Sequence, residues 1–190
     1  MMRKKLFLPA TLFIASSFSG AASANTANPE LTRLLKTAIS ETQSFQDRIE
    51  AEVWFTSMNK RLKRRVKDDR ERVKLLKLIH HEARHANLPP ELVLAVIQIE
   101  SNFDRWAISS VGALGLMQVM PFWLKEIGRP GDNLFNAQTN LRMGCTILRH
   151  YLDIEKGNII KALGRYNGSL GSYKYPRKVL GALRTNWYRP

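Results

Sequence analysis

The sequence predicts a mainly α-helical fold, and three observations lead to that prediction. Apolar residues recur at helical spacing over most of the chain, the alternation typical of strands is hard to find, and prolines and glycines punctuate the periodic segments. The 190 residues suit one domain with a single sizeable core. No internal repeat and no second core-forming domain is evident, so we expect one helical body.

The first 24 residues have the pattern of a secretory signal peptide. Basic residues at 3–5 precede an apolar stretch from Leu6 to Phe18, and small residues follow at 22–24 in the A-x-A pattern. The apolar part is shorter than the roughly 20 residues that a membrane helix needs. We therefore expect cleavage near Ala24 and export to the periplasm.

The formal net charge of +14 indicates a polyanionic neighbour. Nucleic acid, an anionic membrane face and an anionic cell-wall polymer are the three classes, and export argues against nucleic acid. The single cysteine, Cys145, excludes an intramolecular disulfide. It lies in helical register with Leu141 and Leu148, which predicts a buried apolar role and not a nucleophile.

Residues 25–84 are expected to form a basic helical N-terminal region. Pro29 is placed to open a first helix, and a second runs from about Phe45 to Leu62 through apolar residues that include Ile49 and Val53. The segment 60–77 mixes many bases with acids, as on a solvated helix face. Two interpretations remain open for it: a solvated helix, or a basic helix that holds the protein to anionic envelope surfaces.

The sharpest helix start in the chain is the Pro89-Pro90 pair. From 92 to 99 every residue except Gln98 is apolar, which predicts a buried central helix. Further helices are expected at 121–127, 137–155 and 159–166, with Gly157 ending the second of these. Residues 167–176 are predicted to be a loop.

The segment HEARH, residues 81–85, fits the H-E-x-x-H pattern of zinc peptidases. The apolar residues of its helix gather around Leu76, Ile79 and Ala83, so His81 and His85 should point to solvent. No third ligand stands out downstream. We therefore expect no metal site, and the zinc peptidase remains an alternative that a chelator would test.

Glu100 closes the apolar run and is the candidate catalytic residue. Desolvation disfavours a carboxylate and raises its pKa, so a proton stays available near neutral pH. Glycines at 112, 115 and 168 permit close approach of backbone to a ligand. Gln118 offers a donor and an acceptor, and Met117 an adaptable apolar surface. A buried glutamate that is merely satisfied by hydrogen bonds is the alternative.

Two motifs in this part of the chain carry a family resemblance. Residues 100–118 match the pattern E-S-x-F-x-x-x-A-x-S-x-x-G-A-x-G-L-M-Q, and the match continues through VMPFW to Trp123. RYNGS at 165–169 is similar to A-Y-N-x-G, with Arg165 and Ser169 in place of the usual alanine and glycine. In both motifs the chain resembles the lytic transglycosylases, over about residues 85–180.

The resemblance implies a lysozyme-like helical domain of the goose-type or SLT kind over 85–190, with an N-terminal helical extension. It implies cleavage of the β-1,4 bond between N-acetylmuramic acid and N-acetylglucosamine in peptidoglycan glycan strands, with a 1,6-anhydro product and no cofactor. Glu100 would act as acid and then as base. The implied substrate contacts are Ser109, Met117, Gln118, Tyr166 and Asn167.

A single acid distinguishes this chemistry from that of most glycosidases, which use two carboxylates. Asp104 is the nearest other acid in the motifs, and it follows a loop-like sequence. One acid is enough if the N-acetyl oxygen of the substrate stabilises the cation. A hydrolytic muramidase and a non-catalytic wall-binding protein are the alternatives. A secretion or wall-remodelling complex is an open possibility for the partners.

Overall fold

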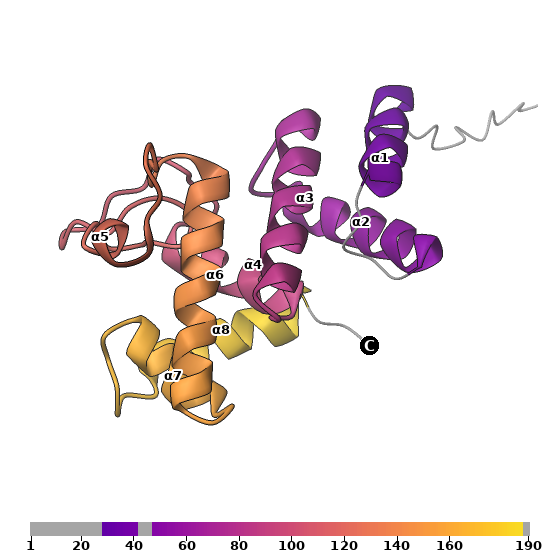
Figure 1. The fold of residues 1–190 in the computed structure, drawn as a ribbon. Coiled ribbons are helices and arrows are strands. Elements are labelled where there is room, and N and C mark those ends of the chain that lie inside the picture. Colours follow the sequence, from indigo (N-terminus) through magenta and orange to yellow (C-terminus); the bar gives the residue numbers. More distant parts are fainter. Residues whose placement is uncertain (1–27, 42–46, 188–190) are drawn as a thin grey trace, which may run out of the picture.

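The computed structural model describes residues 28–41 and 47–187, and the described chain is mostly helical (Figure 1). In chain order the helices are α1 (Pro29–Glu41), α2 (Arg48–Leu62), α3 (Asp69–His85), α4 (Pro90–Glu100), α5 (Trp123–Ile127), α6 (Ala137–Ile154), α7 (Ile159–Tyr166), α8 (Lys174–Ala182) and the π-helix η1 (Leu183–Trp187). Within these ranges only two isolated β-bridges occur, which join Ile108 to Leu114 and Leu114 to Val119. The mainly α prediction is confirmed, and the predicted signal peptide lies outside the described residues.

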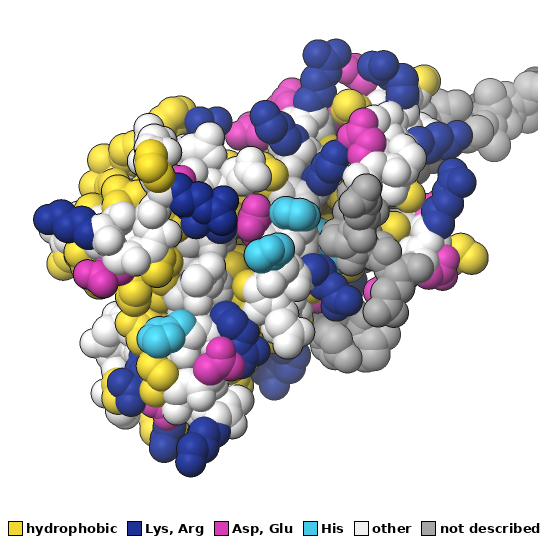
Figure 2. Space-filling view, viewed as in Figure 1, with side chains coloured by type: hydrophobic (Ala, Val, Ile, Leu, Met, Phe, Trp, Pro, Cys, Tyr) yellow, Lys and Arg dark blue, Asp and Glu magenta, His cyan; other side chains and the backbone are white. Residues whose placement is uncertain are grey.

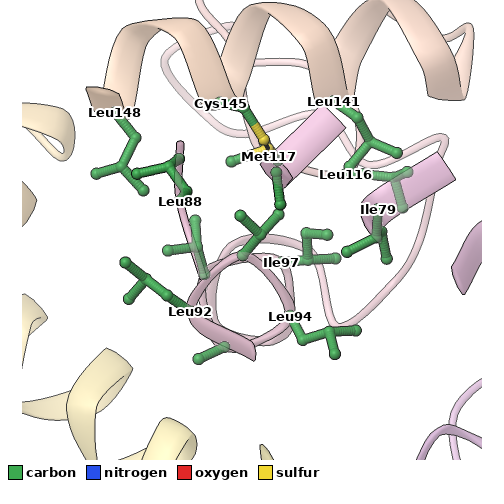
Figure 3. Close-up of a cluster of buried hydrophobic side chains, with 14 of the residues drawn as sticks. Ile79, Leu88, Leu92, Leu94, Ile97, Leu116, Met117, Leu141, Cys145 and Leu148 are labelled. Carbon is green, nitrogen blue, oxygen red and sulfur yellow. Dashed lines mark hydrogen bonds between the residues drawn. The ribbon is translucent and has the colours of Figure 1, made fainter. Parts of the chain in front are cut away.

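Helix α4 is the centre of the core, as the apolar run predicts. Pro90 occupies the first turn, where a missing N–H costs nothing, and the residues from Leu92 to Ile97 are all buried. Helices α3, α8 and η1 pack against α4. Figure 3 shows α4 end-on, with side chains of α6 and of the loop that carries Met117 covering one side of it. Cys145 lies in this layer, fully buried, which confirms its apolar role.

Helices α1 and α2 pack on one another and on α3. Asp47 caps α2 by accepting a hydrogen bond from the Ile49 N–H, and the predicted start near Phe45 lies outside the described residues. The buried face of α2 carries Phe55, Met58 and Leu62. Ile49 and Val53 are on the opposite face and are 71% and 65% exposed, so these two do not belong to the buried stripe.

The charged segment is interrupted between α2 and α3, where Asp68 caps the new helix by accepting from the Glu71 N–H. It also contains a fully buried arginine, Arg72, where a solvated face was predicted. The Arg72 guanidinium donates to Asn59 Oδ1 at 2.7 Å and to the Val66 carbonyl at 2.8 Å. It is buried because its guanidinium satisfies the carbonyls of Val66 and Lys67 in the turn between α2 and α3.

The C-terminal elements follow the prediction up to Tyr166 and then depart from it. Helix α6 ends one residue before the predicted Glu155, and α7 has the predicted bounds. Residues 167–176 are not all loop, because α8 begins at Lys174 with Pro176 in its first turn, a position that tolerates proline. Helices α8 and η1, at the yellow end of the chain in Figure 1, lie against α4 and bring residues 174–187 to the end of the central helix.

No helix in the described ranges combines the length and the apolar character that crossing a membrane requires.

The Asn140 side chain of α6 holds the loop that follows α4 in place through hydrogen bonds. Its side-chain amide donates to the carbonyls of Leu114 and Leu134 at 2.8 and 2.9 Å, and its carbonyl oxygen accepts from the Met117 N–H at 2.8 Å. The side chain is 1% exposed. Two backbone groups of this loop and one of the segment before α6 therefore depend on one side chain.

We expect Asn140→Ala to lower the free energy of unfolding by about 3 kcal/mol, because it leaves buried backbone groups without partners. Gln138→Ala, on the exposed side of the same helix, is the matched control and should change stability by less than about 0.5 kcal/mol. Urea denaturation followed by circular dichroism measures both. Equal stability of the two variants would contradict the role given to Asn140.

Candidate active site

Glu100 is the last residue of α4, held at the end of a rigid buried helix. The next residue, Ser101, closes the helix: its hydroxyl donates to the Leu116 carbonyl at 2.8 Å. Asn102 and Phe103 then adopt positive φ angles of 49° and 71°, which bulky side chains rarely do. The chain thus turns sharply away directly after Glu100, and such rare backbone angles are frequent at functional sites.

The Glu100 side chain lines a cavity of about 330 Å³ between the end of α4, the loop that follows α7, and α8. The residues that line it are Ile99, Glu100, Asn167, Ser169, Ser172, Lys174, Tyr175 and Lys178. Glu100 is the one carboxylate among these lining residues, in the part of the chain that the structure describes. Apart from Ile99, its other neighbours in the cavity are hydroxyls, an amide and two ammonium groups, all of which can bind a polar ligand.

The environment of Glu100 is that of a general acid. Burial raises the pKa of its carboxyl group from 4.5 to about 7, and a hydrogen bond from the Tyr175 hydroxyl to Oε1 acts in the opposite direction. That bond is 2.5 Å long, and the Tyr175 side chain is 7% exposed. Burial, with the nearby Glu100 charge, also raises the pKa of Tyr175, so the phenol stays protonated and donates.

Tyr175 is the site residue that the sequence reading missed. Tyr175 lies within the segment 167–176 that is predicted to be a loop, and it supplies the direct partner of Glu100. Tyr166, one of the implied substrate contacts, donates its hydroxyl to the Met117 carbonyl at 2.8 Å. It therefore joins α7 to the loop after α4. Burial, with the Glu100 charge, raises the pKa of Tyr166, so its phenol stays protonated.

The other predicted contact residues lie in three different locations. Asn167 lines the cavity together with Glu100. Ser109 and Gln118 are half-buried and bond the loop to itself: Ser109 Oγ accepts from the Ala113 N–H, and Gln118 Nε2 donates to two loop carbonyls. The Met117 side chain is fully buried against α6, so it lies in the core and reaches no surface where a saccharide could bind (Figure 3).

Gly115 and Gly168, two of the glycines predicted to permit close approach to a ligand, have different surroundings. Gly115, with φ of +74°, has no room for a side chain, since a Cβ would lie 2.5 Å from the Asn140 amide nitrogen. Its close approach is to α6 and not to a ligand. Gly168, with φ of +70°, faces open space beside Asn167, a backbone conformation that glycine adopts more readily than residues with a Cβ.

The HEARH segment lies on α3 with both imidazoles outward, as predicted. His81 and His85 are exposed, with ring centroids 6.3 Å apart, whereas Glu82 is 5% exposed and lies on the side that faces the protein. Figure 2 shows histidine side chains at the surface of this face of the molecule. Within residues 28–41 and 47–187, no group of three histidine, cysteine or acidic side chains is arranged to hold a metal ion.

Comparison with known proteins places these residues in a family. The model of the transglycosylase SLT domain matches residues 77–184. A transglycosylase of Enterobacteria phage PRD1 is 37% identical over 101 residues, which are 50% of this chain and 37% of that protein. The membrane-bound lytic murein transglycosylase C of Yersinia pestis (strain Pestoides F) is 33% identical over 138 residues, 62% of this chain and 38% of that one.

A solved structure of a 70-kDa soluble lytic transglycosylase with bulgecin A superposes with a TM-score of 0.48 at 24% identity, over 84% of this chain and 25% of the other. The chain thus spans less than two fifths of the length of these relatives. The family match begins inside α3, before the boundary at residue 85 that we predicted, and it covers more than half of the chain. Since the family model matches more than half of the chain, from within α3 to η1, the chain belongs to the transglycosylase SLT domain family.

Proposed function

We propose that this protein is a peptidoglycan lytic transglycosylase, which cleaves the β-1,4 bond from N-acetylmuramic acid to N-acetylglucosamine and leaves a 1,6-anhydromuramyl end. The observation that carries the proposal is Glu100, one carboxylate with a pKa of about 7, held by Tyr175 in a cavity with hydroxyl and amide groups. Family membership and the names of the relatives support the same substrate.

In the first step Glu100, in its acid form, donates its proton to the glycosidic oxygen. The bond from C1 of the muramyl residue to that oxygen breaks, and its electron pair stays on the departing N-acetylglucosamine O4. The carbonyl oxygen of the muramyl N-acetyl group bonds to C1 and takes up the positive charge. Because the substrate supplies this nucleophile, no second carboxylate is required.

In the second step Glu100, now a carboxylate, accepts the proton of the muramyl C6 hydroxyl. The C6 oxygen forms a bond to C1, the bond from the N-acetyl oxygen to C1 breaks, and its electron pair restores the acetamide. No water is consumed, and Glu100 is protonated again. A pKa near the working pH serves both steps, because the same group must first give and then take a proton.

The remaining residues of the cavity bind and orient the strand in this proposal. Asn167 contacts the saccharide directly from the loop after α7. Ser109 and Gln118 act from the half-buried loop, and Tyr166 holds that loop in position through the Met117 carbonyl. The predicted leader would deliver the enzyme to the periplasm, where peptidoglycan lies.

Mass spectrometry of purified sacculi digested by the protein tests the proposal. We expect muropeptides with anhydro ends, which are lighter by one water than those with reducing ends. Reducing ends would identify a hydrolytic muramidase, and an undigested wall bound by the protein would identify a wall-binding function. Inclusion of a chelator should leave the products unchanged, since the exposed His81 and His85 have no part in this chemistry.

The single-acid mechanism makes a separate prediction for Asp104. This carboxylate is exposed, and its Oδ1 accepts from the Trp106 N–H at 2.9 Å, a bond that asparagine also makes. Asp104→Asn should therefore retain the rate of anhydro-muropeptide release within about threefold, whereas loss of a second catalytic carboxylate would cost about 10²-fold or more. A folded Asp104→Asn protein without activity would rule out the substrate-assisted route.

A further inference from the structure

We propose that a basic pocket behind the catalytic helix binds the carboxylates of the peptide stems that peptidoglycan strands carry. The pocket has a volume of about 690 Å³ and lies between the end of α2, the turn after Glu100, and η1. Lys60, Arg61, Arg64 and Arg65 line it. The inference rests on the proposed function for its substrate and adds a second binding site to it.

The described lining of the pocket contains basic residues and no acidic ones. Ser57, Lys60, Arg61 and Arg64 share one side of the chain at helical spacing, and no aspartate or glutamate is among the described lining residues. The six ion pairs of the described residues lie elsewhere: Arg70–Glu30, Arg72–Asp69, Lys77–Glu41, Arg142–Asp132, Arg149–Asp153 and Arg165–Glu155. The four pocket cations take part in none of these.

Two of the arginines are held in place by the protein. Arg65 Nε donates to Asn102 Oδ1 at 3.1 Å, and its guanidinium lies 5.6 Å from the centroid of the Trp187 ring. Arg61 donates one nitrogen to the Trp187 carbonyl at 2.5 Å. Both guanidinium groups keep further N–H donors that bond to none of the described residues, so preorganised donors face the pocket.

The cations of the pocket destabilise one another's charged forms. Burial lowers the pKa of Arg65, and the Arg64 charge lowers it further. Like charges brought together in a hollow, with no acid beside them, favour the entry of an anion. Arginine binds carboxylates in a bidentate fork, and the neutral side chains opposite are amides and hydroxyls that suit the peptide groups of a ligand.

The pocket is connected to the catalytic helix end through the residues two positions before and two positions after Glu100. Asn102, which holds Arg65, is two residues after Glu100. Gln98, two residues before it, accepts from the Asn186 and Trp187 side chains of η1 at 3.2 and 2.9 Å. Side chains two residues apart in a helix point in roughly opposite directions, so Gln98 meets η1 on the pocket side while Glu100 faces the cavity, and the two sites flank the same helix end.

This placement favours peptide stems over a phosphate-bearing surface. A strand held at Glu100 carries a peptide on each muramyl residue, so stems extend from the strand around the helix end. A concave pocket with amide and hydroxyl groups admits a peptide chain with carboxylates. A membrane surface would instead contact cations on a flat or convex face, and this pocket recedes between three chain segments.

The test measures binding of the stem tetrapeptide, released from sacculi by an amidase, by calorimetry with the full chain. Lys60→Gln combined with Arg64→Gln removes two exposed cations that make no ion pair with the described residues. We expect roughly three- to tenfold weaker binding, the modest loss typical of solvent-accessible charge pairs. Lys36→Gln combined with Lys161→Gln, which removes two exposed charges elsewhere, should bind as the wild type does.

A tetrapeptide whose carboxylates are methyl esters should bind neither to the two variants nor to the wild type. Equal affinity of the acid and the ester, equal affinity of pocket variant and wild type, or no binding to the wild type would overturn the inference. Inorganic phosphate and phosphatidylglycerol vesicles are run in parallel. Loss of binding to either of these in the pocket variant, with tetrapeptide binding unchanged, would assign the pocket to phosphate instead.

Failure of the proposed function is recognised independently, because the peptide experiment involves no cleavage. Glycan strands with and without stems, bound to the inactive Glu100→Gln protein, complete the comparison. Stem-bearing strands should bind roughly three- to tenfold more tightly than bare strands, and the pocket variant should lose that difference. If sacculi yield no anhydro product while the tetrapeptide still binds, the catalytic proposal fails and the pocket assignment stands.

Discussion

Glu100→Gln is expected to abolish release of anhydro-muropeptides while leaving the fold intact. Glutamine has the size of glutamate and can still accept a hydrogen bond from the Tyr175 hydroxyl, but it carries no transferable proton. General acid–base catalysis is typically worth about 10²–10⁴-fold, and here one group serves both steps. Product release from sacculi, followed by mass spectrometry, should therefore fall by at least about 10³-fold.

The matched control is Glu126→Gln, which makes the same chemical change on an exposed residue of α5. Its activity should equal that of the wild type. Thermal unfolding confirms that both variants are folded, and Glu100→Gln should be as stable as the wild type or more so above pH 7, because an amide removes a buried charge. A folded Glu100→Gln protein with near-normal activity would refute the assignment of Glu100.

Tyr175→Phe is expected to lower the rate roughly 10–100-fold at neutral pH, since the lost hydrogen bond stabilises a buried charged group. It should also shift the pH profile. The first step needs protonated Glu100, so activity falls as the pH rises through the pKa of about 7. The bond from Tyr175 lowers that pKa, and its removal therefore moves the falling limb to higher pH.

The pH dependence of kcat/KM separates a positioning role from a merely structural one. A structural defect would reduce the rate but would leave the falling limb of the pH profile at the same pH. Tyr173→Phe serves as control, because Tyr173 is 58% exposed and its contact with Arg177 is through the ring. An unchanged limb in Tyr175→Phe would mean that Tyr175 does not tune Glu100, whatever the loss in rate.

Helix periodicity was enough to predict much of the fold from local sequence. The run from Leu92 to Ile97 has no polar residue, so only a central position removes all its sides from water. The proline pair set the start of α4, and Glu100 at its end was identifiable as a desolvated acid because the apolar run stops there. The solvent-facing imidazoles of His81 and His85 followed from the same helical reasoning.

Contacts between distant segments decided the rest. Tyr175 meets Glu100 across 75 residues, and no local pattern distinguishes it from Tyr173 or from the motif residue Tyr166. Arg72 looked like one more charge on a solvated face, and it is buried because the turn between α2 and α3 presents carbonyls to it.

The Glu100 cavity and the basic pocket likewise depend partly on local sequence and partly on contacts between distant segments. The sequence by itself determined a helical protein with one desolvated acid and a large positive charge, because periodicity, apolar runs and charge are properties of neighbouring residues. Only the tertiary structure decided which groups surround that acid and where unpaired cations collect. Packing of α8 and η1 against α4 places Tyr175 at Glu100 and closes the basic pocket with Asn186, and those contacts depend on the whole core.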